Sequence, residues 1–154
     1  MITVIQRVTQ SEVSVDDETI GKIGRGIMAL IAVEKNDTRQ QAERLAERLL
    51  SYRIFPDAGG RMNLSVRDID GGLLLVPQFT LAADTRKGTR PGFEPAASPE
   101  LGRELFEYFQ QIVRQSHPQV ACGRFGADMH VALINDGPVT FILRAPPAAA
   151  AAKS

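Results

Sequence analysis

Two short segments of this sequence carry groups that could polarise a carbonyl carbon for attack. The first spans residues 77–81, where an apolar run ends and backbone N–H groups can point at a developing oxyanion. The second spans residues 135–140, with the sequence Asn-Asp-Gly-Pro-Val-Thr. Each segment also suits an ordinary element, namely a strand exit in which Thr80 caps a turn, and a hairpin turn. The residue types alone leave both interpretations open.

The side chains that most enzymes use for catalysis are scarce. Two histidines and one cysteine are present. His117 precedes Pro118 at a predicted helix end, where a positive side chain complements the helix dipole, and His130 lies on a predicted strand, so we interpret both as structural. Nothing in the sequence would stabilise a thiolate at Cys122, and a buried structural cysteine is the favoured interpretation. These few residues offer no ligand set, so we predict no metal and no cofactor.

The charge balance limits how the chain could hold a nucleic acid. It has 18 basic and 18 acidic residues among 154, for a formal net charge of zero. Proteins that bind nucleic acids through their phosphates usually have a clear basic excess. Any RNA contact must therefore be local, and Arg86, Lys87 and Arg90 form the candidate cluster, although a solvated charged loop explains them as well.

The composition also indicates where the protein works. With 44% hydrophobic and 23% charged residues it suits one folded domain. The single cysteine excludes an internal disulfide and fits a reducing compartment. No apolar run approaches the roughly 20 residues that cross a bilayer. We expect a cytoplasmic protein without a membrane partner.

The first half of the chain is predicted to form most of a sheet. Residues 2–34 are rich in β-branched residues and predict three or four strands. A capping-box pattern followed by apolar residues at helical spacing predicts a helix over roughly residues 38–52. The apolar run 72–76 predicts a central strand that stops at Pro77, because proline donates no ladder hydrogen bond.

The second half is predicted to contain a functional loop and a second helix. Residues 82–97 hold several glycines and prolines and are predicted to be a loop, and irregular stretches of that length are often functional. Ser98 and Pro99 are typical of a helix start, and Pro118 ends that helix. Two closing strands are expected, at residues 128–134 and 139–143.

These elements predict an α/β fold with one domain, residues 1–145. A mixed β-sheet core would carry two main helices on one face, and the N-terminal strands would add a further layer. A second subunit is the alternative cover for the other face. The alanine- and proline-rich tail, residues 146–154, is expected to be disordered.

At its two chemical segments the sequence resembles the D-aminoacyl-tRNA deacylase family of the bacterial type. The signatures of this family are Ser-Gln-Phe-Thr, matched at residues 77–80 except that Pro77 replaces serine, and a motif matched at residues 135–140. The resemblance extends from Met1 to about Leu143. It includes residues 5–8, 63–64, 83–86 and 90–91. A hydroxyl-based role at position 77 cannot operate here.

The resemblance implies an activity in the proofreading of translation. Such an enzyme hydrolyses the ester between a D-amino acid, or mischarged glycine, and the 3′-terminal ribose of tRNA, and it rejects L-aminoacyl-tRNA. Related deacylases with relaxed selectivity are similar to a Pro-Gln-Ala-Thr pattern, so Pro77 keeps a deacylase for glycine or certain L-amino acids as an alternative. Phe79 and the intact second motif favour the chirally selective type. A nucleic-acid-binding module without catalysis is the alternative from another class.

The resemblance also assigns roles at the first motif. Backbone N–H groups of Phe79 and Thr80 would form the oxyanion hole, and Gln78 would shape that loop. Water, assisted by the terminal 2′-hydroxyl of the RNA, would then attack the ester. Thr80 as a direct nucleophile is the competing mechanism, and no base lies near it in the sequence.

The second motif is implied to act on a neighbouring subunit. The Gly137–Pro138 peptide bond would be cis and inserted into the partner's active site in a homodimer, where its carbonyls hold the substrate ammonium and exclude an L side chain. Arg7 would brace this motif. Phe125 would stack on the terminal adenine, unless it is an ordinary apolar loop residue. The basic loop would contact phosphates of the acceptor stem.

Overall fold

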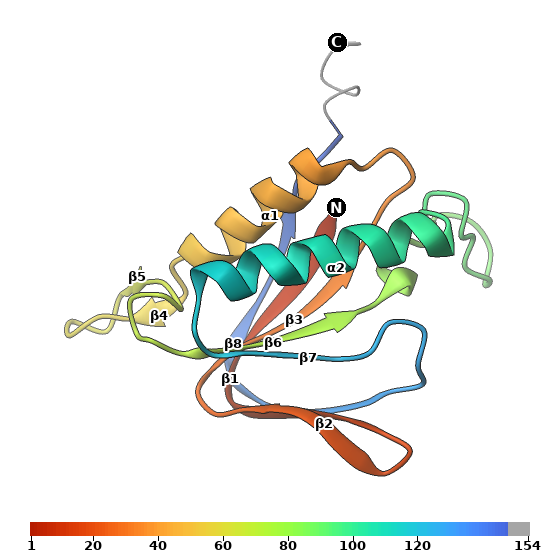
Figure 1. Ribbon diagram of the computed structural model, residues 1–154. Helices are drawn as coiled ribbons and strands as arrows, with labels where there is room; N and C mark the ends of the chain where they lie inside the picture. Colours follow the sequence, from red (N-terminus) through yellow and green to blue (C-terminus); the bar gives the residue numbers. More distant parts are fainter. Residues whose placement is uncertain (148–154) are drawn as a thin grey trace.

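A six-stranded mixed sheet organises residues 1–147, the part of the chain that the computed structural model describes (Figure 1). Its strand order is β2-β1-β3-β6-β7, and β8 pairs with β1. Strands β3, β6 and β7 run parallel, and β1 is antiparallel to its three partners. The strands are β1 (Ile2–Val15), β2 (Glu18–Ile23), β3 (Gly26–Ala32), β6 (Gly72–Pro77), β7 (Val120–Cys122) and β8 (His130–Arg144). A separate small hairpin joins β4 (Phe55–Pro56) to β5 (Met62–Leu64).

Two helices cover one face of this sheet, as the sequence predicts (Figure 1). Helix α1 (Arg39–Ser51) begins with a capping box in which Thr38 and Gln41 exchange hydrogen bonds. Helix α2 (Pro99–Ser116) begins after Ser98, whose hydroxyl accepts a hydrogen bond from a backbone N–H of the first turn. Both predicted helix starts are confirmed. None of the helices in residues 1–147 is long and apolar enough to span a membrane.

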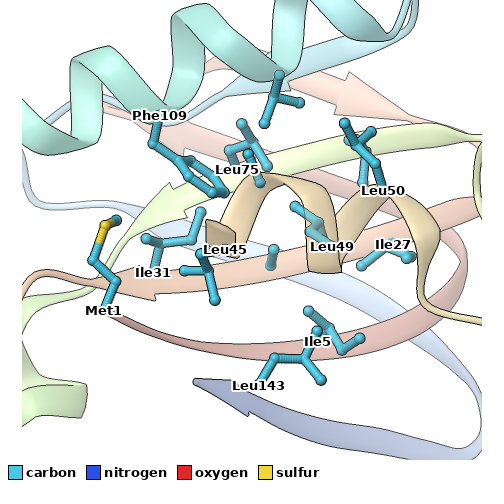
Figure 2. Packing of buried hydrophobic residues seen from close by; sticks show 14 of the residues in the cluster. Met1, Ile5, Ile27, Ile31, Leu45, Leu49, Leu50, Leu75, Phe109 and Leu143 are labelled. Atoms are coloured by element: carbon cyan, nitrogen blue, oxygen red, sulfur yellow. The ribbon is translucent and has the colours of Figure 1, made fainter. Parts of the chain in front are cut away.

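The main core lies between the sheet and the helices (Figure 2). Leu45 and Leu49 of α1 and Phe109 of α2 are fully buried against sheet residues such as Ile5 and Ile31. Removing a side chain of this kind from water stabilises the fold by about 1.5–3 kcal/mol. The core therefore fixes the end of β6, from which the first chemical segment emerges.

The opposite face of the sheet is covered by the same chain. Leu73 and Leu75 of β6 face the helices, whereas Leu74 and Val76 pack in a second cluster with residues of β1 and β2. A Cβ placed on Gly72 would lie 2.9 Å from Cβ of Ile23, so β2 approaches the backbone of β6 closely. The N-terminal strands do not form the separate further layer predicted, but β2 and part of β1 cover this face. They are continuous with the main sheet, and with both faces covered β6 can be apolar throughout.

The prediction of two closing strands is wrong, and the alternative interpretation of residues 135–140 as a hairpin turn is wrong as well. Residues 130–144 form one strand, β8, and both of its halves pair with β1. A hairpin would reverse the chain direction at residues 135–138. Strand β1 is 14 residues long and offers a partner to both halves, so the chain continues in one direction.

The α-amino group of Met1 lies in the interior. It donates hydrogen bonds of 2.8 Å to Oδ1 of Asp37 and to the carbonyl of Ala145, and Oε1 of Glu34 lies 3.6 Å away. The side chains of Met1 and Asp37 are both fully buried. This ion pair joins the start of β1, the turn before α1 and the end of β8. The predicted tail begins just beyond, and its residues 148–154 lie outside the described residues.

Candidate active site

The first chemical segment lies where β6 leaves the sheet. The backbone N–H of Gln78 donates the last hydrogen bond of this strand, 2.7 Å to the carbonyl of Ile31. The 3-10 helix η1 (Phe79–Ala82) begins directly afterwards. The first N–H groups of a helix have no partner within it, and the hydrogen bonds of residues 1–147 include none donated by the backbone of Phe79 or Thr80. Two adjacent donors are therefore free for a ligand.

The hydroxyl of Thr80 is held by its neighbour. Nε2 of Gln78 donates a short hydrogen bond to Oγ1 of Thr80. Within the described chain no carboxylate or imidazole hydrogen bonds to this hydroxyl. A hydroxyl becomes a good nucleophile when a general base accepts its proton. The arrangement therefore favours the backbone groups over the Thr80 hydroxyl as the chemical feature of this segment.

A cavity of about 450 Å³ opens beside Phe79, the first of these two donors. Gln78 and Phe79 line one side, and the start of α2 and the loop with Phe125 line the other. The Phe125 ring is half-buried, with the guanidinium carbon of Arg103 5.0 Å from its centre. A Cβ on Gly102 would lie 3.3 Å from Cζ of Phe125, so this glycine leaves room for the ring. The fold thus brings Phe125 to the cavity that Gln78 and Phe79 line.

Two exposed aromatic rings mark the surface near the cavity. Phe79 is 60% exposed and Phe93 is 43% exposed, and their ring centres are 5.3 Å apart. Exposed aromatic pairs are typical of sites that receive a ligand or a partner. Sequence reasoning missed Phe93, for which the only signal was its place in the 82–97 loop.

The second chemical segment projects from β8. Strand β1 pairs Gln6 with Thr140 and Val8 with Asn135, so Arg7 alone faces the four residues 136–139. The Gly137–Pro138 peptide bond is cis. We call residues 136–139 the excursion. It is a wide bulge on a strand that pairs along one side only among the described strands.

Arg7, which the resemblance implies braces this motif, hydrogen bonds to the first residue of the excursion. Its Nε donates 2.9 Å to the carbonyl of Asp136 and is 3.3 Å from a carboxylate oxygen of the same residue. Its Nη1 donates 2.7 Å to the carbonyl of Ile54. Asn135 contributes a second set of contacts, with Arg7 and Val139, that sequence reasoning missed.

The excursion and the cavity lie apart within one chain. Gly137 and Pro138 do not line the cavity. Strands β1 and β3 lie between β8 and β6. Along the sheet, Arg7 of β1 pairs with Ile27 of β3, whereas Pro77 of β6 pairs with Ile31 of β3. With about 4.8 Å between neighbouring strands and about 3.3 Å per residue along a strand, the excursion is roughly 20 Å from the end of β6. A single chain therefore does not bring the two segments together.

The basic cluster divides into one paired and two unpaired residues. Nε and Nη2 of Arg86 each lie 2.9 Å from a carboxylate oxygen of Asp84. These hydrogen bonds from Arg86 lower the pKa of Asp84 to about 2, so the carboxylate stays ionised at neutral pH. Lys87 and Arg90 are exposed and form no ion pair within residues 1–147. They are the better placed to contact a phosphate.

The groups interpreted as structural differ in burial, since His117 is buried, Cys122 is half-buried and His130 is exposed. His117 is buried, with Nε2 2.6 Å from the carbonyl of Gly71. Burial raises the pKa of the Cys122 thiol, only partly offset by the nearby charge of Arg114, which disfavours a reactive thiolate. His130 is exposed at the start of β8. Among residues 1–147 no three His, Cys, Asp or Glu side chains are grouped to hold a metal ion.

Comparison with known families decides what kind of protein has this geometry. A family model described as D-Tyr-tRNA(Tyr) deacylase matches residues 4–144. The chain belongs to this family. Among the curated members of the deacylase family, the D-aminoacyl-tRNA deacylase of Methylococcus capsulatus is 61% identical over 147 residues, covering 96% of each chain. That of Cupriavidus necator is 59% identical and covers 96% of this chain and 100% of its own.

Solved structures with the same fold extend the deacylase comparison. A c-Myc DNA unwinding element binding protein superposes with a TM-score of 0.91 at 37% identity, covering 95% of this chain and 99% of its own. A probable eukaryotic D-amino acid tRNA deacylase superposes with a TM-score of 0.80, covering 92% and 97%. At 20% identity the second likeness concerns the fold alone. The predicted family and fold class are confirmed.

Proposed function

We propose that this chain is a D-aminoacyl-tRNA deacylase that hydrolyses the ester between a D-amino acid and the 3′-terminal ribose of tRNA. The observation that carries the proposal is the pair of free backbone N–H groups at Phe79 and Thr80, of which Phe79 lines a cavity of about 450 Å³. An activated ester needs a polarised carbonyl and a placed nucleophile, and it needs neither a metal nor a triad. The two bacterial relatives are both named D-aminoacyl-tRNA deacylase, which supports the same reaction for this chain.

The proposed mechanism places the oxyanion on the backbone. The carbonyl oxygen of the ester accepts hydrogen bonds from Phe79 and Thr80, which stabilise the negative charge of the tetrahedral intermediate. Water attacks the carbonyl carbon, assisted by the terminal 2′-hydroxyl of the RNA, and the ribose oxygen leaves. Gln78 keeps the segment in shape through its hydrogen bond to the Thr80 hydroxyl. The same hydrogen bond, with no base nearby, ranks Thr80 second as a nucleophile.

The active site is proposed to be completed by a second copy of the chain. The excursion is roughly 20 Å from the cavity of its own chain, and it projects from a strand with a free edge. Ile134 and Ile142 of β8 are 52% and 61% exposed, and large exposed apolar residues mark protein contacts. In a homodimer the Gly137–Pro138 carbonyls would reach the partner's cavity. A monomer would then be inactive.

Chiral selectivity would follow from the space that the excursion leaves. Its carbonyls would hold the substrate ammonium, so that an L side chain would collide with the backbone while a D side chain points away. Glycine has no side chain and should be admitted, which makes glycyl-tRNA a second substrate. An enzyme of this kind removes wrong amino acids in the cytoplasm before the ribosome uses them.

The acceptor end of the tRNA is proposed to lie across the cavity mouth. The ring of Phe125 would stack on the terminal adenine, and Lys87 and Arg90 would contact phosphates. Because the net charge of the chain is zero, these contacts are local. Binding should accordingly weaken with salt, with the shallow slope of a few phosphate contacts.

The direct test is hydrolysis of D-tyrosyl-tRNA and L-tyrosyl-tRNA by the purified protein, with glycyl-tRNA as a third substrate. We expect release of the D-amino acid and of glycine, and no release of the L-amino acid. Equal release of D and L would replace this proposal with a deacylase of relaxed selectivity, for which Pro77 is the reason. Release of none, with RNA still bound, would leave a binding module, as the name of one solved relative suggests for that relative.

Replacing Gly137 with alanine should damage selectivity. A Cβ at this position would lie 2.3 Å from the backbone nitrogen of Val139 and 2.4 Å from Oδ1 of Asn135, so the excursion must move. Sub-ångström misplacement of a selective surface is expected to lower the D/L ratio of kcat/KM by about tenfold. Gly24→Ala is the matched control, since nothing lies within 4 Å of its Cβ. An unchanged ratio in folded Gly137→Ala would contradict the assigned role.

A further inference from the structure

The excursion lacks the ladder hydrogen bonds that hold the rest of β8. Between the pairs Gln6 with Thr140 and Val8 with Asn135, one residue of β1 faces four of β8. Backbone that leaves a ladder is mobile unless side chains replace the missing bonds. A surface that must exclude one enantiomer needs a fixed shape. Other groups must therefore hold the excursion in place.

The side chain of Asn135 closes the base of the excursion. Its Nδ2 donates one hydrogen bond of 3.0 Å to the carbonyl of Arg7 and another of 3.0 Å to the carbonyl of Val139. Both amide hydrogens are thus used, and both acceptors are backbone carbonyls, which only the amino group of the carboxamide can satisfy. The first bond ties the excursion to β1 and the second ties its beginning to its end.

The carboxamide also fills the inner side of the bend. Its Oδ1 lies 2.4 Å from the place of a Cβ on Gly137, so this oxygen occupies the space that a side chain there would need. Arg7 completes the arrangement, because its carbonyl accepts from Asn135 while its Nε donates to Asp136. Arg7 and Asn135 therefore both hold the same bend by hydrogen bonds.

We propose that Asn135 is a positioning residue for chiral selectivity. It does not touch the substrate. It acts through the excursion, because it holds the Gly137–Pro138 carbonyls in one position and orientation. This inference rests on the proposed function of the excursion in a partner's active site. It adds a specific cause for the selectivity, namely two hydrogen bonds from one carboxamide.

The test compares three variants of Asn135 with a control on the same ladder. Asn135→Asp keeps the size of the side chain, removes both donors and faces the two carbonyls with carboxylate oxygens. Asn135→Ala removes the group, and Asn135→Ser keeps one donor. Gln6→Ala is the control, since it removes a 3.1 Å bond to Thr140 next to the excursion and leaves the excursion's own bonds intact.

We expect the Asp and Ala variants to lower the D/L ratio of kcat/KM by about tenfold and to raise KM for D-tyrosyl-tRNA more than they lower kcat. The Ser variant should lie between them and the wild type, and Gln6→Ala should match the wild type. A merely structural asparagine would lower the melting temperature without changing the ratio. Each variant is therefore also tested by thermal unfolding.

Two outcomes separate the failure of this inference from that of the proposed function. If the folded Asn135 variants keep the wild-type ratio while Gly137→Ala lowers it, the inference is overturned and the role of the excursion stands. If Gly137→Ala also keeps the ratio, the excursion does not set selectivity and the inference falls with it. Should the Asp variant fail to fold, the Ala and Ser variants decide.

Discussion

Replacing Thr80 with proline should lower the rate of D-tyrosyl-tRNA hydrolysis by about 10²–10³-fold, the usual cost of losing one oxyanion donor. Proline has no N–H, so the variant removes one of the two free donors at the end of β6. That N–H has no partner among residues 1–147, and proline is tolerated in the first turn of a helix, so the fold should survive. Single-turnover hydrolysis and thermal unfolding measure the two effects.

The matched control is Thr80→Ala, which removes the hydroxyl and keeps the backbone N–H. We expect it to retain activity within about tenfold of the wild type, because the hydroxyl only receives a hydrogen bond from Gln78. Complete loss of activity in a folded Thr80→Ala protein would instead support Thr80 as the nucleophile. The pair of variants thus separates a backbone mechanism from a side-chain mechanism at one position.

Replacing Asp37 with alanine should lower the free energy of unfolding by about 3–5 kcal/mol, since it leaves the buried ammonium of Met1 without its main counter-ion. The ammonium and the carboxylate are 2.8 Å apart and both side chains are fully buried. Oδ2 of Asp37 also accepts 2.7 Å from the N–H of Glu34, and that donor would lose its partner as well. Urea unfolding monitored by circular dichroism gives the value.

An exposed ion pair serves as the control for Asp37. Nζ of Lys35 lies 3.7 Å from a carboxylate oxygen of Glu94, and the two side chains are 58% and 90% exposed. Glu94→Ala should change stability by less than about 1 kcal/mol, because solvent screens the pair. Equal effects of the two substitutions would show that the interior ion pair contributes no more than a surface one.

Local patterns in the sequence predict most of the elements. The start of α1 is specified by the pairing of Thr38 with Gln41, and that of α2 by Ser98 and Pro99, because these contacts involve neighbours in sequence. The apolar run 72–76 is the central strand β6. Strand β7 has three residues and was missed, since three residues are too few to show a period.

Features that depend on distant partners were harder to predict. The Asn-Asp-Gly-Pro run has the composition of a hairpin turn, and β1, more than a hundred residues earlier, makes it a bulge instead. The contact between Asn135 and Arg7 also joins residues far apart in the sequence, so local patterns do not predict it. Residue types pointed to the two chemical segments and the resemblance to a family assigned their roles, but Phe93 and the cavity beside Phe79 emerge only when the loop and the strand end lie together.

Within residues 1–147 one edge of β8 has no partner strand, and this affects how the protein behaves at high concentration. An uninterrupted edge strand is a template on which other chains can add, and open-ended addition leads to aggregates. The excursion divides the 15 residues of β8 into two short runs, and Pro138 between them offers no N–H to an incoming strand. The excursion, which is proposed to discriminate between enantiomers, therefore also hinders other chains from adding to this edge of the sheet.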